Sequence, residues 1–293
     1  MADSKLSAAL DLMRRLPPQK VQDHLYKLVD ISPESIHPDL YEMIDVPLEI
    51  ETCDSHNRPF LCSDLNRDAD SYRSPFSGEY QPPLEDGLKP SPELRKLEIK
   101  MNDAFIEYTR QYYAGGISSV YLWELDDGDC NPMFNGFNGV VLIKKKTTNE
   151  EDSQGNSTGS WDSINVFKCS IDAANKKASY ELTTTVLLWL KQNKMDLGIM
   201  DLSGSLTRQN LLDKKDVKFT KLDDHIKHIG QLIENTENGM RNSLSEIYFS
   251  KTLTGINTCR SIEPLADERA KIRLADELNK KLLDKSGIMS DKR

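Results

Sequence analysis

Five runs rich in β-branched and aromatic residues follow one another between residues 120 and 207, and no helical pattern interrupts them. Consecutive strands joined by loops alone pair antiparallel, because a parallel pair needs a long crossover connection. The sequence therefore predicts a five-stranded antiparallel sheet within residues 115–210. The runs are 120–125, 139–144, 161–169, 178–190 and 197–207.

A long helix is expected to follow the sheet and to cover one of its faces. Apolar residues recur at helical spacing after Asp223, over about 30 residues or roughly 45 Å at 1.5 Å per residue. We assign this helix to residues 220–258. Its predicted apolar stripe consists of Ile226, Ile229, Ile233, Met240, Leu244 and Ile247.

The segment before the sheet divides into two parts. Residues 1–45 carry three short amphipathic patterns, and such short helices must pack on one another or on a partner. Residues 46–114 begin as a connector rich in Pro, Asp, Ser and Asn, which we expect to be irregular, and end in a helix from Pro92 to Tyr113. The fold class is therefore α+β.

Composition and charge exclude several classes of protein. A net charge of −9 disfavours nucleic acid or an anionic membrane as the main partner. No apolar run reaches the roughly 18 residues that a membrane-spanning helix needs. The five cysteines are scattered and odd in number, without a CxxC pair, so we expect free thiols. The N-terminus does not resemble a secretion signal, which favours a cytoplasmic location.

The C-terminal segment 262–293 differs in charge from the rest of the chain. Eight basic and four acidic residues follow position 268, which places +4 on residues 269–293 and −13 on residues 1–268. Leu274, Leu278 and Leu282 span about 80° of one helical face. Two interpretations stay open, namely a helix packed permanently on the rest of the chain and an amphipathic arm that binds an acidic partner.

A calcium loop is suggested by the alternating acids from Asp64 to Asp70, but the pattern is incomplete. Ala69 replaces the glycine of the sharp turn, and Pro75 stands where a bidentate Glu should close the shell. We expect Asx turns and ion pairs to Arg67 and Arg73 here instead of a metal.

Catalytic and cofactor motifs are also incomplete. His225 and His228 could share a metal, but no third ligand is evident, and we expect them to be solvated or capping residues. The sequence around Ser205 lacks the GxSxG elbow, and no glycine-rich phosphate loop occurs. We expect neither a cofactor nor catalysis, with a small hydrolase that uses Ser205 and a histidine as a remote alternative.

Several longer motifs resemble the β subunit family of F-actin capping protein, in the family's order along the chain. Ser63, Leu65 and Phe76 depart from the family's pattern, and the loop at 127–137 is longer than the family's. The motifs that carry the resemblance are Leu10–Gln19, Asn66–Pro75, Pro82–Gly87, Leu94–Glu98, Gly115–Trp123, Trp161–Ile164, Gly204–Gln209 and Asn242–Phe249.

The resemblance implies an obligate heterodimer with an α subunit, in which residues 1–45 form a helical stalk and the two sheets join side by side. It implies calcium-independent binding to the barbed end of actin filaments, a place in the actin cytoskeleton, and regulatory proteins as further partners. A structural subunit of an actin-related filament complex, such as dynactin, is the alternative. The residues expected to contact actin are Leu274, Leu278, Leu282, Lys280, Lys281 and Lys285.

Overall fold

The structure is a computed structural model of the chain. It describes residues 2–125, 136–148, 157–172, 176–194, 198–210, 217–251, 253–254 and 265–290. Residues up to Met240 form one compact unit and residues from Arg241 onward form another, and each is treated by itself. Most of the loop expected at 127–137 lies outside the described residues.

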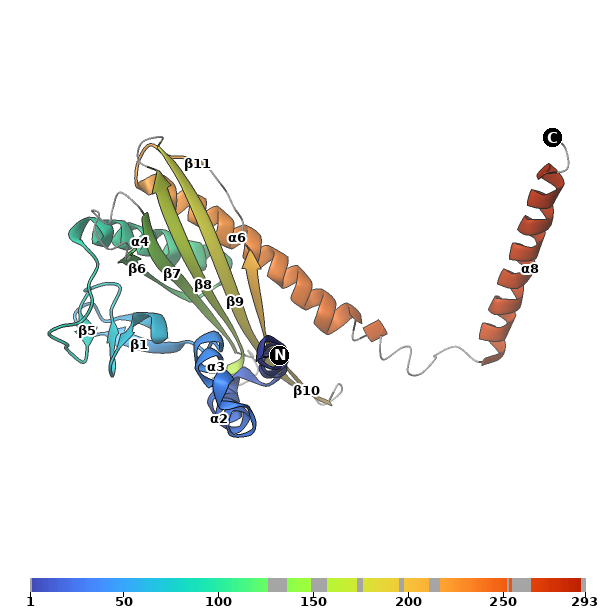
Figure 1. The fold of residues 1–293 in the computed structure, drawn as a ribbon, viewed down its shortest axis with the longest axis horizontal. Helices are drawn as coiled ribbons and strands as arrows, with labels where there is room; N and C mark the ends of the chain where they lie inside the picture. Colours follow the sequence, from blue (N-terminus) through green and yellow to red (C-terminus); the bar gives the residue numbers. More distant parts are fainter. Residues whose placement is uncertain are drawn as a thin grey trace. The chain divides into compact units, whose positions relative to one another are not determined.

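The predicted combination of helices with a five-stranded antiparallel sheet is confirmed (Figure 1). The strands pair in the order β10-β9-β8-β7-β6, so each one pairs with its neighbour in the sequence, and a short strand β11 pairs with β9. The strands extend beyond the predicted runs, because polar residues at their ends continue the ladder. Their bounds are β6 Ile117–Glu124, β7 Gly136–Thr148, β8 Ser157–Asp172, β9 Lys177–Lys194, β10 Gly198–Asn210 and β11 Val217–Lys218.

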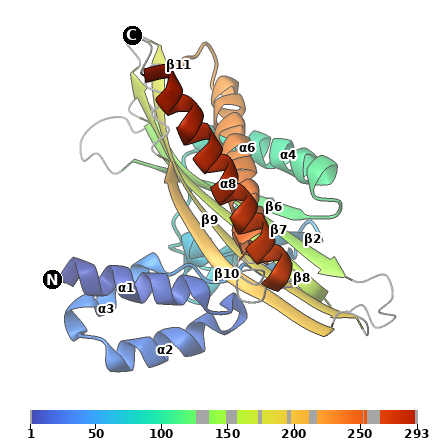
Figure 2. The same cartoon turned by 90° about the vertical axis from the view of Figure 1, so that its right-hand side faces the viewer.

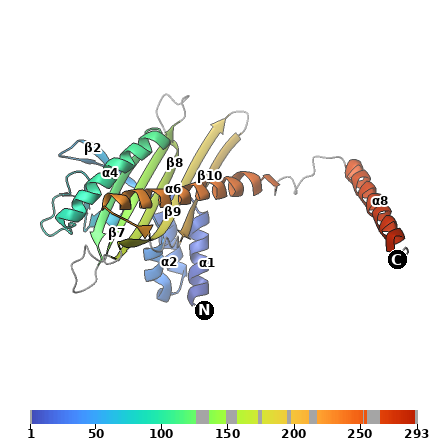
Figure 3. The ribbon, with the colours of Figure 1, turned by 90° about the horizontal axis from the view of Figure 1, so that it is seen from above.

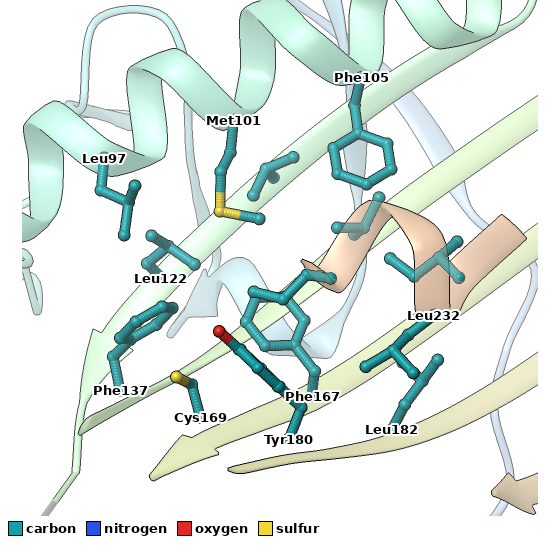
Figure 4. Close-up of a cluster of buried hydrophobic side chains, with 14 of the residues drawn as sticks. Leu97, Met101, Phe105, Leu122, Phe137, Phe167, Cys169, Tyr180, Leu182 and Leu232 are labelled. Carbon is teal, nitrogen blue, oxygen red and sulfur yellow. The ribbon is translucent and has the colours of Figure 1, made fainter. Parts of the chain in front are cut away.

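Two helices, α4 (Pro92–Tyr112) and α6 (Asp223–Ser245), lie on the same face of the sheet (Figure 3). Ser91 caps α4, since its hydroxyl accepts a hydrogen bond from the amide of Leu94, and Pro92 occupies the first turn. Figure 4 shows the core that the two helices form with the sheet. Its fully or nearly buried side chains include Leu97, Met101, Phe105, Leu122, Phe137, Phe167, Cys169, Tyr180, Leu182 and Leu232.

The α6 helix follows the predicted stripe for most of its length. Ile229, Ile233, Met240 and Leu244 are buried. Ile247 is 43% exposed and lies in a π-helical segment, Glu246–Lys251, where the wider turn breaks the 3.6-residue period. The regular helix is therefore 23 residues long and shorter than predicted.

The N-terminal region forms three helices that pack on one another (Figure 2). They are α1 (Ala2–Arg15), α2 (Val21–Ile31) and α3 (His37–Met43). Their shared core contains Met13, Leu25, Leu28, Ile36 and Leu40. Pro17 and Pro18 separate the first two helices, because proline lacks the amide that would continue a helix.

The connector is more ordered than its sequence predicts. It contains a hairpin of β1 (Glu49–Cys53) and β2 (Arg58–Cys62), and a small sheet of β3 (Arg67–Asp68), β4 (Ser71–Arg73) and β5 (Tyr80–Gln81). Strands of two to five residues are too short to produce a recognisable alternation, which explains why the prediction of an irregular segment was wrong.

Buried ion pairs attach the connector to the sheet and to α4. Lys144 Nζ lies 2.6 Å from an oxygen of Asp162, and that same oxygen accepts the amide of Leu48 at 2.9 Å. Arg73 donates to both oxygens of Glu98 at 2.8 Å, and neither side chain is more than 5% exposed. The ion pair that we expected between Arg73 and the acids at 64–70 was therefore wrong.

The outer edge of β6 is capped at Val120 and Leu122 by two side chains of α4 and by Arg73 of β4. The side-chain amide of Asn102 donates a hydrogen bond to the carbonyl of Val120 and accepts one from its backbone amide. Glu98 accepts a hydrogen bond from the amide of Leu122 at 2.7 Å. Arg73 donates to the Leu122 carbonyl at 3.4 Å. These side chains satisfy groups that would otherwise attract another strand.

The second unit contains α8 (Leu265–Ser290), a helix of 26 residues. Every residue from Arg269 to Lys281 is exposed in the structure. No helix among the described residues combines the length and the apolar character needed to cross a membrane.

Candidate interaction sites

The predicted actin-contacting residues all lie on α8. Leu274 and Leu278 are one turn apart and remain 63% and 54% exposed. Lys280 and Lys281 are exposed as well, and Leu282 and Lys285 lie further along the same helix. At about 100° per residue, Lys285 falls within the leucine stripe and Lys281 falls directly beside it, whereas Lys280 lies far from it. The helix therefore presents an apolar stripe interrupted by positive charge.

The opposite side of α8 also carries apolar surface. Ile272 lies about 160° from Leu274 around the helix axis and is 60% exposed. An exposed helix of this kind gains stability when its apolar residues are covered by another surface.

A second candidate site is the outer edge of β10. Among the described strands, β10 pairs with β9 through all of its 13 residues, and it ends the sheet. Long edge strands present rows of backbone donors and acceptors to other chains. The sheet therefore has one edge that is capped at Val120 and Leu122, and one that no described strand pairs with.

The remote hydrolase interpretation depends on Ser205, which lines a cavity of about 30 Å³ together with His24 and Asp45. No hydrogen bond joins Ser205 to His24 within the described part of the chain. The cavity is about the size of one water molecule, so it cannot hold a substrate. Burial raises the pKa of Asp45, despite a hydrogen bond from Thr185 that lowers it.

His225 and His228 are not the solvated pair that the sequence suggested. His225 is fully buried, and the hydroxyl of Tyr180 lies 2.6 Å from its Nδ1 atom and 3.0 Å from Nδ1 of His228. The thiol of Cys169 lies 3.7 Å from His225 Nδ1. Burial lowers the pKa of His225 to about 4, with a smaller effect from His228. The helical spacing alone could not reveal this pairing with β8 and β9.

The acidic run at 64–70 is organised by Arg67. Its guanidinium lies 3.9 Å from Asp64 and 3.4 Å from Asp70, which matches the ion pairs expected there. The described residues contain no cluster of three or more His, Cys, Asp or Glu side chains arranged to hold a metal ion.

Three described cysteines, Cys53, Cys62 and Cys169, are buried free thiols, whereas Cys130 and Cys259 lie outside the described residues. Burial alone would raise the pKa of Cys53, but hydrogen bonds from Ser55, Ser74 and His56 outweigh it and lower the pKa to about 6. Ser55 and His56 lie in the β1–β2 turn, whereas Ser74 lies in the loop after β4, and its approach to Cys53 could not be predicted from local spacing.

Comparison with known proteins identifies relatives over most of the chain. A family model described as "F-actin capping protein, beta subunit" matches residues 6–254. The chain is 44% identical over 278 residues to the F-actin-capping protein subunit beta of Drosophila melanogaster, covering 95% of both chains. It is 43% identical over 279 residues to the protein of that name from Caenorhabditis elegans, covering 95% of this chain and 97% of the relative.

Among solved structures, a match is the homodimeric actin capping protein alpha subunit from Plasmodium berghei. Its TM-score is 0.48 at 18% identity, with 90% of this chain and 99% of that chain covered. The family model spans the three N-terminal helices, the sheet and α6, and the two relatives are well above 30% identity over nearly their whole length. The chain therefore belongs to the F-actin capping protein beta subunit family.

Proposed function

We propose that the chain pairs with an α subunit and that the heterodimer caps the barbed ends of actin filaments, without catalysis and without calcium. The family match over residues 6–254 carries this proposal. The relatives are named for F-actin, which does not favour a subunit of a different, actin-related filament. We place the protein in the cytoplasm, at the actin cytoskeleton, where proteins that regulate capping are further partners.

The sheet edge at β10 is where we expect the α subunit to join. The β6 edge is closed by Asn102 and Glu98, and β10 pairs with β9 alone among the described strands. Strand addition at β10 would extend the sheet and cover this edge. We expect α1, α2 and α3 to act as a stalk, since exposed apolar side chains such as Tyr26 (63%) and Ile31 (80%) remain to be covered.

The α8 helix is proposed as the mobile arm that contacts actin. Burial of Leu274, Leu278 and Leu282 yields roughly 4–9 kcal/mol before costs, at about 1.5–3 kcal/mol for each leucine. Association alone costs an estimated ~4–15 kcal/mol, so the arm by itself binds weakly. Connected to the heterodimer, it acts at high effective concentration and prolongs residence on the filament end. Lys280, Lys281 and Lys285 steer it toward an acidic surface.

The experiment is to express the chain alone and together with an α subunit, and to measure barbed-end elongation from filament seeds. We expect the chain alone to be insoluble or unstable, because the β10 edge and the exposed faces of α1, α2 and α3 have no partner then. The co-expressed protein should purify as a one-to-one complex and stop elongation at substoichiometric amounts. A stable, cooperative monomer contradicts the obligate heterodimer, and a heterodimer that leaves elongation unchanged contradicts capping.

A further inference from the structure

The side chains that close the β6 edge follow a regular spacing that stops at one position. Glu98 accepts the amide of Leu122, and Asn102, one helical turn later, pairs with Val120. Strand residues two apart direct their backbone groups to the same side. The next pair in this series is therefore Ile106 with Ser118.

Ile106 cannot continue the series, because its side chain has no hydrogen-bonding group. The hydroxyl of Ser118 lies 3.4 Å from that of Thr109, but no hydrogen bond from α4 reaches the Ser118 backbone within the described residues. Leu122 and Val120 are thus capped by α4, whereas the outward amide and carbonyl of Ser118 receive no cap from it among the described residues.

A groove of about 240 Å³ opens at this uncapped step. Its apolar lining comes from Pro59, Phe76, Ile106 and Ile117, and Gly115, Gly116 and Ser118 line it as well. We call it the Ser118 groove. Its residues come from β2, the loop after β4, the C-terminal half of α4 and the beginning of β6.

Positive charge lies at the rim of the Ser118 groove, although the chain as a whole is acidic. Arg58 stacks on the ring of Phe76, with its guanidinium carbon 4.2 Å from the ring centroid, and has no carboxylate partner among the described residues. Arg110 pairs with Glu107 at 2.7 Å and is 74% exposed. Stacking holds the Arg58 guanidinium in place while its charge remains available.

We propose that the Ser118 groove binds a short, extended acidic segment of a partner protein. The backbone of the segment pairs with Ser118 as an added strand, an aliphatic side chain enters the apolar part, and a carboxylate meets Arg58. Strand addition at a sheet edge commonly combines these elements, with backbone bonds for affinity and pockets for specificity. None of the residues that line the groove belongs to β10 or to α8.

The test uses the purified heterodimer and a fluorescein-labelled eight-residue peptide in which Glu and Val alternate. Binding is measured by fluorescence polarisation, with a Lys–Val peptide of the same length as the control for charge. A second control is the Glu–Val peptide methylated on alternate backbone nitrogens, which cannot form strand bonds along one edge. Both methylation frames are tested, because either edge of the peptide can face β6.

The decisive variant is Ile106→Asn, which supplies the missing cap, with Ile106→Leu as the matched control. We expect Ile106→Asn to weaken binding of the Glu–Val peptide by about tenfold or more, because the peptide must then compete with a side chain for Ser118. Ile106→Leu should bind within about twofold of the unaltered heterodimer. Arg58→Glu should weaken binding by about fivefold, and Arg15→Glu, at an exposed position of α1 outside the groove, should not.

The proposal is overturned if the Glu–Val peptide does not bind at millimolar concentration, or if both methylated forms bind as well as the unmodified peptide. Equal affinity of the Ile106→Asn and Ile106→Leu heterodimers overturns it as well. Hydrogen exchange gives an independent readout, because the bound peptide should slow exchange of the Ser118 amide while leaving that of Val120 unchanged.

Discussion

Asn102 faces Val120 with both ends of its side-chain amide, donating from Nδ2 to the carbonyl at 2.9 Å and accepting the backbone amide on Oδ1 at 2.8 Å. Its Nδ2 atom also donates to the carbonyl of Glu98 at 3.0 Å. One helical side chain thus takes the place of a neighbouring strand at the edge of the sheet.

Replacement of Asn102 by Leu should destabilise the heterodimer by about 2–5 kcal/mol, since two buried backbone groups of Val120 lose their partners. The measurement is urea unfolding at fixed protein concentration. Asn235→Leu, at an exposed position of α6, is the control and should change stability by less than about 0.5 kcal/mol. Equal stability of the two variants would mean that water satisfies Val120.

Stability should fall as the pH decreases from about 6.5 to about 4, because the pKa of His225 is lowered from 6.5 to about 4 in the folded chain. Within this window the unfolded chain binds the proton and the folded chain does not. Between pH 7 and pH 5 the loss amounts to about 2 kcal/mol. Cys169, Tyr180, His228 and Asp224 are the titratable groups that act on His225 in the fold.

The measurement for His225 is the urea midpoint at pH 7 and at pH 5, for the unaltered protein and for His225→Phe. We expect a shallower pH dependence in the variant, because it removes the buried group that must stay neutral. If both proteins lose the same stability between the two pH values, other groups are responsible.

Removal of residues 269–293 should speed dissociation from barbed ends and leave the heterodimer folded, and Leu278→Arg should have much of the same effect. The physical reason is the loss of the leucine stripe from the arm that α8 provides. Dissociation is measured by the return of growth at single capped filaments. Asn279→Arg adds the same charge about 100° away on α8 and serves as the control.

Two results would contradict this view of α8. An unchanged dissociation rate after truncation means that the helix is not an actin contact. Failure of the truncated chain to assemble with the α subunit favours the helix packed permanently on the rest of the protein.

Capping should be unaffected by chelation of divalent cations. Arg67 balances the acidic run from Asp64 to Asp70 through two ion pairs, so a cation is not needed to neutralise it. The measurement is elongation from filament seeds in EGTA, with actin alone as the control for effects on the filament. A loss of capping that calcium restores would show that this run, or another part of the chain, holds an ion.

The sheet and the α6 helix were predictable because each depends on local periodicity. Alternation and long apolar runs placed β6 to β10, and the spacing from Ile229 to Leu244 placed α6. The small strands of the connector carry no such pattern. Arg73 with Glu98 and His225 with Tyr180 are pairings between residues far apart in the sequence, and periodicity contains no information on partners of that kind.

The candidate sites also differ in how far the sequence alone predicts them. The stripe of Leu274 and Leu278 on α8 follows from helical spacing alone. The Ser118 groove requires the registration of α4 against β6, which a single sequence does not reveal. Glu98, Asn102 and Ile106 follow one another at i, i+4 spacing, as two polar residues and then an apolar one. Which backbone groups they cap depends on β6, which lies beside α4.

The order of the strands has a consequence for synthesis on the ribosome. Each long strand from β6 to β9 pairs with the next one in the sequence, so the meander can grow hairpin by hairpin as the chain emerges. The hydrogen bond between Tyr113 and Glu237 closes a separation of 124 residues, and the Lys100–Asp223 pair closes one of 123. Until α6 has left the exit tunnel, the apolar face that it covers is open to solvent, and this is the interval in which the nascent chain most needs protection from aggregation.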